Sequence, residues 1–318
     1  MMPTVLLTAE CEMACPWCFA QATMRRYQSR ELREMPWENI ERVAAFYRRS
    51  GVRHMTLLGG EPTRHSRFLD ALHFLQSMGI AATVVTHGHI PPTLTDALAD
   101  ARLKAVRYIV NSTRLLDGDD AAQAPVRYAL TRLGPQTMLS YTITEGDLAA
   151  PGPESLLDRL LLIMRYRLQP HLQLQIAVPA EGNRGYVPFD HYPDLLRLLA
   201  AWSDLLRRNR VSHGLDCHAI PLCALRDAPA LGLPARVRCT SPMIDIGPDL
   251  QVWPCFPSAD AHWRLHDFEN IAHLTSVVLE HWAHASPRLR QGCAQCADYR
   301  AGRCGAGCRG FSWSPEAS

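Results

Sequence analysis

The chain alternates short apolar runs with longer segments in which apolar residues recur every three to four positions. The short runs are rich in β-branched residues, which favours β-strands. They cover residues 3–8, 53–58, 81–86, 105–110, 136–144 and 172–178. An amphipathic segment that predicts a helix follows each run, and these segments cover residues 36–49, 66–77, 92–101, 119–133, 153–166 and 190–208. Glycines at Gly51, Gly79 and Gly134 indicate where three of the helices end.

Six strand–helix units in succession predict parallel strands that are joined by right-handed helical crossovers. We therefore expect an α/β fold in which residues 1–210 form a partial (β/α)6 barrel of the TIM type. A doubly wound sheet is the alternative, because periodicity alone does not distinguish the two. In both folds, binding groups belong at the C-terminal ends of the strands.

The pattern changes after about residue 210, where proline, glycine and cysteine replace the long periodic segments. Residues 245–255 predict two short strands around a Gly-Pro-Asp turn, and residues 274–285 predict a helix. We expect residues 211–318 to form a small cysteine-rich α+β domain. A domain with so small a core needs additional stabilisation, for which bound metal is one source.

Composition narrows the choice of partners and of compartment. The chain has 318 residues, with 33 Lys and Arg against 31 Asp and Glu, so its net charge gives no sign of a nucleic-acid or membrane partner. It has no apolar run of about 18 residues and no signal-peptide pattern, and we expect a cytoplasmic protein. Eleven cysteines in a reducing compartment favour metal binding over disulfides.

Three cysteines, Cys11, Cys15 and Cys18, directly follow the first predicted strand. Their spacing allows one loop to wrap a compact inorganic centre through thiolate ligands. Three ligands leave one metal position open, and a small molecule can bind there. A zinc site with a fourth ligand elsewhere and incidental cysteines are the alternatives.

The segment CEMACPWC, residues 11–18, resembles the C-x3-C-x-aromatic-C motif of the radical S-adenosylmethionine (radical SAM) enzymes. The resemblance implies that Cys11, Cys15 and Cys18 hold a [4Fe-4S] cluster, and that S-adenosylmethionine chelates its fourth iron. It also implies that Trp17 lies near the adenine.

The end of the next predicted strand also resembles this family, because Gly59, Gly60, Glu61 and Pro62 match its GGEP motif. In the family this motif meets the methionine amino group. Glycines allow close approach to the backbone, and a carboxylate neutralises an ammonium group. A simple strand-ending turn is the alternative. The resemblance extends cofactor binding, more weakly, to three residues at the ends of the third and fourth strands: Thr86, Asn111 and Ser112.

His87 departs from the family, which often has Asn at this position. It is either a turn residue or a titratable group that faces the substrate. An oxidative reaction also needs a base. The base candidates are His87 and four loop acids, each of which has a solvated surface role as its alternative: Glu145, Asp147, Glu181 and Asp249.

Eight further cysteines resemble the SPASM or twitch extension of many radical SAM enzymes: Cys217, Cys223, Cys239, Cys255, Cys293, Cys296, Cys304 and Cys308. Two departures are a central gap of seven residues where the family has five, and no cysteine after Cys308. Eight cysteines make two sets of four, so we expect two auxiliary [4Fe-4S] clusters. One auxiliary cluster and structural zinc are the alternatives.

The resemblance implies an oxidoreductase that reductively cleaves S-adenosylmethionine to a 5′-deoxyadenosyl radical, which abstracts a hydrogen atom from the substrate. We expect a peptide or protein side chain as the substrate. The first alternative is a small molecule, such as a sugar, nucleoside or amino-acid derivative, and the second is a zinc-binding scaffold without catalysis. Expected partners are an electron donor of the flavodoxin or ferredoxin type and a separate leader-peptide-binding protein.

Overall fold

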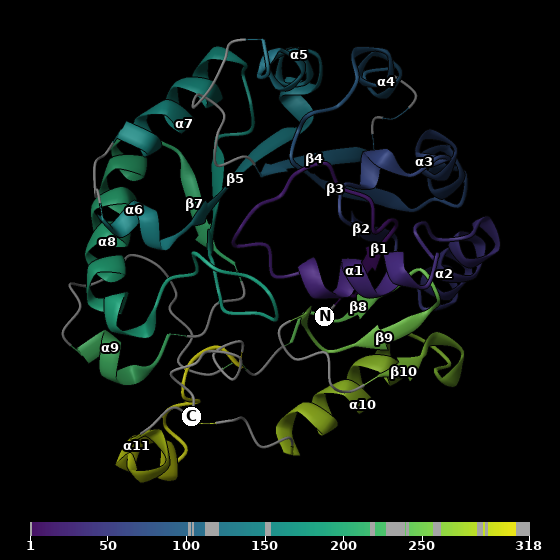
Figure 1. The fold of residues 1–318 in the computed structure, drawn as a ribbon. Helices are drawn as coiled ribbons and strands as arrows, with labels where there is room; N and C mark the ends of the chain where they lie inside the picture. Colours follow the sequence, from purple (N-terminus) through teal and green to yellow (C-terminus); the bar gives the residue numbers. More distant parts are fainter. Residues whose placement is uncertain are drawn as a thin grey trace.

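A computed structural model describes residues 2–100, 103, 105–111, 121–149, 154–216, 220–226, 239, 242–256, 262–284, 289 and 292–309. Seven parallel strands follow one another across the sheet in chain order (Figure 1). They are β1 (Thr4–Leu6), β2 (His54–Leu58), β3 (Ala81–Thr86), β4 (Val106–Asn111), β5 (Thr137–Ile143), β6 (His171–Ile176) and β7 (Ser212–Leu215). The expected α/β class with a parallel sheet is confirmed.

Helices cover the outer face of this sheet, as Figure 1 shows. The α-helices are α1 (Gln21–Ser29), α2 (Trp37–Arg49), α3 (Phe68–Ser77), α4 (Pro92–Leu98), α5 (Ala124–Leu133), α6 (Glu145–Ala149), α7 (Glu154–Arg165), α8 (Tyr192–Arg208), α9 (Leu222–Arg226), α10 (Ile271–His284) and α11 (Ala297–Arg300). Short 3-10 segments are η1 (Pro62–Arg64), η3 (Gly134–Gln136), η4 (Phe189–His191), η6 (Leu265–Asp267) and η7 (Cys293–Gln295). None of the described helices has the length and apolar character needed to cross a membrane.

The strands alternate between two environments, as their period-2 pattern predicts. In β3, Ala82 and Val84 are buried beneath the helices, whereas Thr83 and Val85 on the other face are partly accessible. One core cluster joins β1 to β4 with α2 and α3, and a second joins β4 to β7 with α5, α7 and α8. The inner face therefore remains available for binding groups.

The C-terminal part of the chain completes the same sheet. Three short strands, β8 (Asp245–Ile246), β9 (Gln251–Trp253) and β10 (Trp263–Arg264), extend it beyond β1. β8 pairs with β1 in parallel and with β9 in antiparallel orientation, so the predicted hairpin is confirmed. Strand β7 and this hairpin both lie after residue 210, and the sheet therefore crosses the expected boundary between domains.

Candidate metal and cofactor site

The loop between β1 and α1 carries Cys11, Cys15 and Cys18 at the carboxyl end of β1. None of the three cysteines forms a disulfide with another described residue; Cys11 is exposed, and Cys15 and Cys18 are partly buried. The backbone N–H of Cys18 donates to the carbonyl of Cys15 at 3.1 Å, and that of Met13 donates to Cys11 Sγ at 3.4 Å. The first of these bonds closes a turn between Cys15 and Cys18, and the second fixes the backbone directly after Cys11.

The segment after β6 braces this cysteine loop from across the barrel. The backbone N–H of Arg184 donates to the carbonyl of Pro16 at 2.8 Å, and Asn183 Nδ2 donates to the carbonyl of Trp17 at 3.2 Å. Asn183 is itself held by the carbonyl of Val178 at 2.9 Å. The loop therefore has fixed partners on a strand connection far away in the sequence.

Two glycines let the end of β2 pass close to the cysteine loop. A Cβ on Gly59 would lie 2.6 Å from the carbonyl oxygen of Thr8, and one on Gly60 would lie 2.3 Å from that of Glu10. The close approach allows the N–H groups of Gly60 and Glu61 to donate to Thr8 and Glu10, both at 2.7 Å. The GG pair of the GGEP motif thus aligns the backbone that leads into Cys11.

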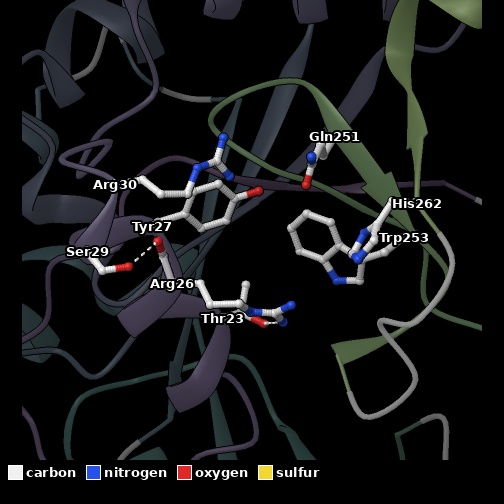
Figure 2. Close-up of a pocket in the computed structure, with 8 residues that line it drawn as sticks. All are labelled: Thr23, Arg26, Tyr27, Ser29, Arg30, Gln251, Trp253 and His262. Carbon is white, nitrogen blue, oxygen red and sulfur yellow. Dashed lines mark hydrogen bonds between the residues drawn. The ribbon is translucent and has the colours of Figure 1, made fainter.

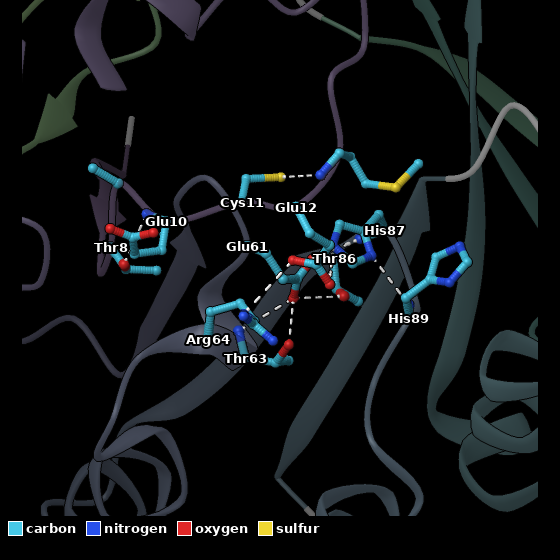
Figure 3. Close-up of polar contacts among 12 residues, drawn as sticks. Thr8, Glu10, Cys11, Glu12, Glu61, Thr63, Arg64, Thr86, His87 and His89 are labelled. Atoms are coloured by element: carbon cyan, nitrogen blue, oxygen red, sulfur yellow. Dashed lines mark hydrogen bonds and ion pairs between the residues drawn. The ribbon is translucent and has the colours of Figure 1, made fainter. Parts of the chain in front are cut away.

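The Glu61 carboxylate is completely buried and accepts hydrogen bonds from neighbouring residues of the protein (Figure 3). Its Oε1 accepts hydrogen bonds from Thr63 Oγ1 at 2.7 Å and Thr86 Oγ1 at 2.8 Å. Its Oε2 accepts the backbone N–H of His87 at 2.9 Å. Glu61 therefore fixes the end of β3 and η1 relative to the cysteine loop, which is a positioning role.

His87 faces the cysteine loop, as Figure 3 shows. Its Nε2 lies 3.2 Å from Glu61 Oε2 and 3.5 Å from Glu12 Oε1, and its side chain is 11% exposed. Cys11 Sγ, a Glu12 carboxylate oxygen and a His87 ring nitrogen all lie within 4.8 Å of one another. The ring of His89 packs against that of His87, with centroids 5.3 Å apart. Neither Glu12 nor His89 was singled out from the sequence, because neither belongs to the fixed positions of a local motif.

The donor set fits an iron–sulfur cluster. The surrounding protein raises the pKa of the Cys11 thiol to about 11, chiefly by displacing solvent, with the nearby Glu61 and Glu12 carboxylates adding to the rise. Burial also raises the pKa of Cys18. Without metal these two groups are thus neutral thiols at neutral pH, and metal binding would displace their protons. Three thiolates from one loop suit a [4Fe-4S] cluster with one open iron.

A ladder of polar side chains crosses the carboxyl ends of β4 to β7. Asn111 Nδ2 donates to Gln175 Oε1 at 3.1 Å, and Thr142 Oγ1 lies 3.2 Å from both Asn111 Oδ1 and Gln175 Oε1. Gln175 Nε2 donates to Asp216 Oδ2 at 3.4 Å. Asn111 was expected at the site, and the other three were not. The polar residues that alternate along β5 and β6 were the signal for them.

Two of the acidic base candidates, Glu145 and Asp147, lie on α6; Glu181 lies in the segment after β6, and Asp249 lies in the C-terminal hairpin. Asp147 accepts from Thr144 N at 2.7 Å and Thr144 Oγ1 at 2.8 Å. Asp249 accepts from Tyr27 Oη at 2.9 Å. Two others are exposed: Glu145, which lies 4.0 Å from His191, and Glu181. The role of a base stays a prediction for these residues and for His87.

Contacts in the C-terminal part join segments that carry the other cysteines. Leu222 N donates to Cys304 Sγ at 3.4 Å, so the start of α9, which includes Cys223, lies against Cys304. Trp282 Nε1 donates to the carbonyl of Cys239 at 2.8 Å. In η7, Cys296 N donates to the carbonyl of Cys293 at 3.0 Å. Cys217 and Ser112 lie outside the described residues. The grouping of ligands stays a prediction.

Comparison with known sequences finds similarity mainly in the N-terminal part. The sequence model of the Radical SAM superfamily matches residues 5–114. Over 150 residues the chain is 27% identical to a probable GTP 3′,8-cyclase of Thermococcus kodakarensis, covering 45% of this chain and 47% of that protein. Over 134 residues it is 32% identical to a PqqA peptide cyclase of Methylorubrum populi, covering 42% of this chain and 32% of that protein. The chain thus spans less than half the length of these relatives.

Comparison with solved structures extends the similarity of fold over nearly the whole chain. Streptococcus suis SuiB bound to S-adenosylmethionine matches 94% of this chain and 72% of its own, with a TM-score of 0.65 and 13% identity. SuiB bound to the precursor peptide SuiA matches 94% of this chain and 70% of its own, with a TM-score of 0.62 and 12% identity. At this identity the likeness shows the fold.

Proposed function

We propose that the protein is a radical SAM enzyme that modifies a peptide or protein side chain, since the sequence model of the Radical SAM superfamily matches residues 5–114. One observation carries the proposal. Three cysteine side chains lie on a single loop at the carboxyl end of β1, where Gly60 and Glu61 hold the backbone that leads into Cys11. A [4Fe-4S] cluster and S-adenosylmethionine bound there would supply an electron and a 5′-deoxyadenosyl radical that abstracts hydrogen.

The residues around this loop act mainly by position. Cys11, Cys15 and Cys18 would hold the cluster, and Trp17 would lie near the adenine. The glycine pair would set the distance between β2 and the cluster. Glu61 has its oxygens engaged by Thr63, Thr86 and His87, so it would keep the backbone carbonyls of its turn in place for the amino group of S-adenosylmethionine. A rigid arrangement of this kind favours one reacting geometry over others.

Two features support a peptide substrate. SuiB, whose fold this chain shares, has a structure with its precursor peptide, and the PqqA peptide cyclase is a relative by sequence. The ladder of Asn111, Thr142, Gln175 and Asp216 also presents hydroxyl, amide and carboxylate groups, which match the donors and acceptors of a peptide backbone. A small-molecule substrate is the second candidate, favoured by the match to a probable GTP 3′,8-cyclase.

We further propose that the C-terminal cysteines hold auxiliary clusters, as two [4Fe-4S] sets in a SPASM or twitch-like domain over residues 211–318. Support comes from the contacts that join α9 to Cys304, and Cys239 to α10. Such clusters would carry electrons between the substrate radical and an external flavodoxin- or ferredoxin-type donor. A separate leader-binding protein and a cytoplasmic location belong to the same proposal, since iron–sulfur clusters and free thiols suit a reducing compartment.

The test is reduction of anaerobically purified protein with dithionite in the presence of S-adenosylmethionine. We expect 5′-deoxyadenosine, together with about 12 irons per chain if three cubane clusters are present. The variant with Cys11, Cys15 and Cys18 changed to Ala should keep about 8 irons and form no 5′-deoxyadenosine. A colourless protein that contains zinc, or equal 5′-deoxyadenosine from the variant, would overturn the proposal.

A further inference from the structure

A pocket of about 150 Å³ lies between α1 and the C-terminal hairpin (Figure 2). Its floor is formed by the buried side chains of Thr23, Tyr27 and Trp253, and Arg26 and Arg30 stand at its rim. None of the pocket-lining residues belongs to the proposed sets of metal ligands. In Figure 2 the rings of Tyr27 and Trp253 face each other across the pocket; their centroids are 6.5 Å apart.

The indole N–H of Trp253 has no hydrogen-bond acceptor in the described part of the chain. Trp253 is 2% exposed, and its Nε1 has no hydrogen-bond partner among the described residues. Buried indole N–H groups normally find a partner, because leaving one unpaired in the interior costs free energy. Since this side chain lines the pocket, a ligand in the pocket is a source of the missing acceptor.

The two arginines differ in how their charges are balanced. Arg30 lies 3.1 Å from Asp249 Oδ2, and Asp249 also accepts from Tyr27 Oη at 2.9 Å and Gln251 N at 3.1 Å. Arg26 instead donates to the neutral hydroxyl of Thr23 at 3.2 Å. Within the part of the chain that the structure describes, no carboxylate forms an ion pair with Arg26. Among the described residues, the Arg26 guanidinium at the pocket therefore has no carboxylate to balance its charge.

We propose that this pocket binds a carboxylate of the substrate, with Arg26 and Trp253 Nε1 as the donors. A carboxylate only accepts hydrogen bonds, and its two oxygens match one guanidinium and one N–H. Asp249 shows that the adjoining wall already holds a carboxylate with an arginine and a tyrosine hydroxyl. The inference rests on the proposed function, since it takes the ligand to be an acidic side chain of the peptide. A pocket of this size admits one such side chain.

The location suits substrate anchoring. Helix α1 begins three residues after Cys18, and Trp253 lies two residues before Cys255. Phe256 packs against both Trp253 and Phe19, with ring centroids 5.5 Å and 5.2 Å apart. An acidic side chain in the pocket would therefore hold the peptide on elements that adjoin both cysteine regions.

The test follows the indole N–H resonance of Trp253 in the cluster-loaded protein, labelled with ¹⁵N-tryptophan and assigned from the spectrum of Trp253→Phe. The probes are Nα-acetyl-glutamate N-methylamide, its glutamine counterpart and inorganic phosphate at equal ionic strength. We expect a saturable shift with the glutamate compound only. In Arg26→Gln its affinity should fall about tenfold or more. Arg197→Gln on α8 makes the same change in net charge at another exposed site and should leave the affinity unchanged.

Equal shifts with the glutamate and glutamine compounds, or undiminished affinity in Arg26→Gln, would overturn the proposal. Tighter binding of phosphate than of the glutamate compound would also overturn the proposal, because it would show that the pocket prefers another anion to a carboxylate. The measurement needs no turnover. Failure of glutamate binding together with normal 5′-deoxyadenosine formation would overturn the carboxylate pocket and leave the radical SAM proposal standing. Glutamate binding without 5′-deoxyadenosine formation would overturn the radical SAM proposal and leave the pocket standing.

Discussion

Glu61 has no surface in contact with solvent, and its two oxygens accept hydrogen bonds from three residues in two segments, η1 and the end of β3. Glu61→Gln keeps the shape but turns one oxygen into an NH₂ group. An NH₂ group accepts no hydrogen bond. It therefore cannot replace either the oxygen that accepts from the two hydroxyls or the oxygen that accepts from the backbone N–H. We expect a loss of about 1–3 kcal/mol in the free energy of unfolding, as for other buried polar groups left unpaired, and weaker binding of S-adenosylmethionine.

Urea unfolding and calorimetric titration with S-adenosylmethionine measure the two effects of Glu61→Gln. Glu12→Gln is the matched stability control, because the Glu12 side chain is 38% exposed and its charge is solvated. It should change the unfolding free energy by less than about 0.5 kcal/mol. Equal stability of Glu61→Gln and the original protein would show that the carboxylate does not fix the site.

Asp245 on β8 is a buried acid opposite β1. It is 1% exposed, Thr4 Oγ1 donates to its Oδ1, and burial raises its pKa to about 8. In the unfolded chain the group ionises near pH 4, so between about pH 4 and 8 the folded state binds one more proton than the unfolded state. Stability from this group is therefore fully present below pH 4 and falls by roughly 1 kcal/mol per pH unit up to pH 8.

Asp245→Asn removes this titration. We expect the variant to be more stable than the original protein at pH 8, with a flatter dependence of the urea midpoint on pH between 5 and 8. Asp267→Asn, at a half-exposed position, is the control and should keep the original slope. A parallel pH dependence in Asp245→Asn and the original protein would contradict the raised pKa.

At the scale of elements, the cysteine loop depends on how closely β2 passes it. Gly60→Ala would place a Cβ 2.3 Å from the carbonyl oxygen of Glu10, which is backbone and cannot turn away. We expect a loss of about 1–3 kcal/mol in unfolding free energy and a displaced Cys11, with a loss of about four irons per chain. Gly146→Ala in α6 is the control, because its Cβ would approach nothing nearer than 3.6 Å. Iron analysis distinguishes the two variants, and full iron content in Gly60→Ala would contradict the role of the close approach.

Sequence patterns predicted the elements that depend on local alternation. The strand expected over residues 81–86 coincides with β3, and the helix expected over residues 36–49 begins one residue later as α2. Several elements were missed, among them β7 and α1. β7 has the sequence SHGL, with neither β-branched residues nor strong alternation, and α1, QATMRRYQS, is mostly polar. α1 is held instead by tertiary packing of Met24 and Tyr27 against Trp253.

The residues of the site also fall into two groups, those that belong to a local sequence motif and those that meet only in the folded chain. Cys11 and Gly60 were identified because each belongs to a motif that is contiguous in the sequence. The contacts of His87 with Glu12, and the ladder from Asn111 to Asp216, join residues that are distant in the sequence. No local pattern fixes which of those side chains meet. Their pairing follows from the order of the strands in the sheet, which only the three-dimensional structure provides.

At the scale of the whole molecule, the N-terminal and C-terminal parts share one core. Ile244, Ile246 and Val252 from the C-terminal hairpin region belong to the same buried cluster as Val5 of β1 and Leu7, which follows β1. The hairpin also supplies Trp253 to the proposed carboxylate pocket. Folding of the first part thus includes a segment from beyond residue 210. The cysteine loop is supported separately from the C-terminal part. The described hydrogen bonds that support this loop come from the end of β2, from α1 and from the segment after β6.

This separation predicts how the last cysteines behave. Changing Cys293, Cys296, Cys304 and Cys308 to Ala leaves the hairpin and the supports of the cysteine loop intact. We expect the variant to lose about four irons or more, yet to cleave S-adenosylmethionine with dithionite at a rate within about threefold of the original. Iron analysis and 5′-deoxyadenosine formation measure this, with circular dichroism to verify folding. A folded variant that keeps its remaining iron but cannot cleave S-adenosylmethionine would contradict this expectation. It would show that the C-terminal cysteines act directly on the first cluster, because the hydrogen bonds that support the cysteine loop would still be present.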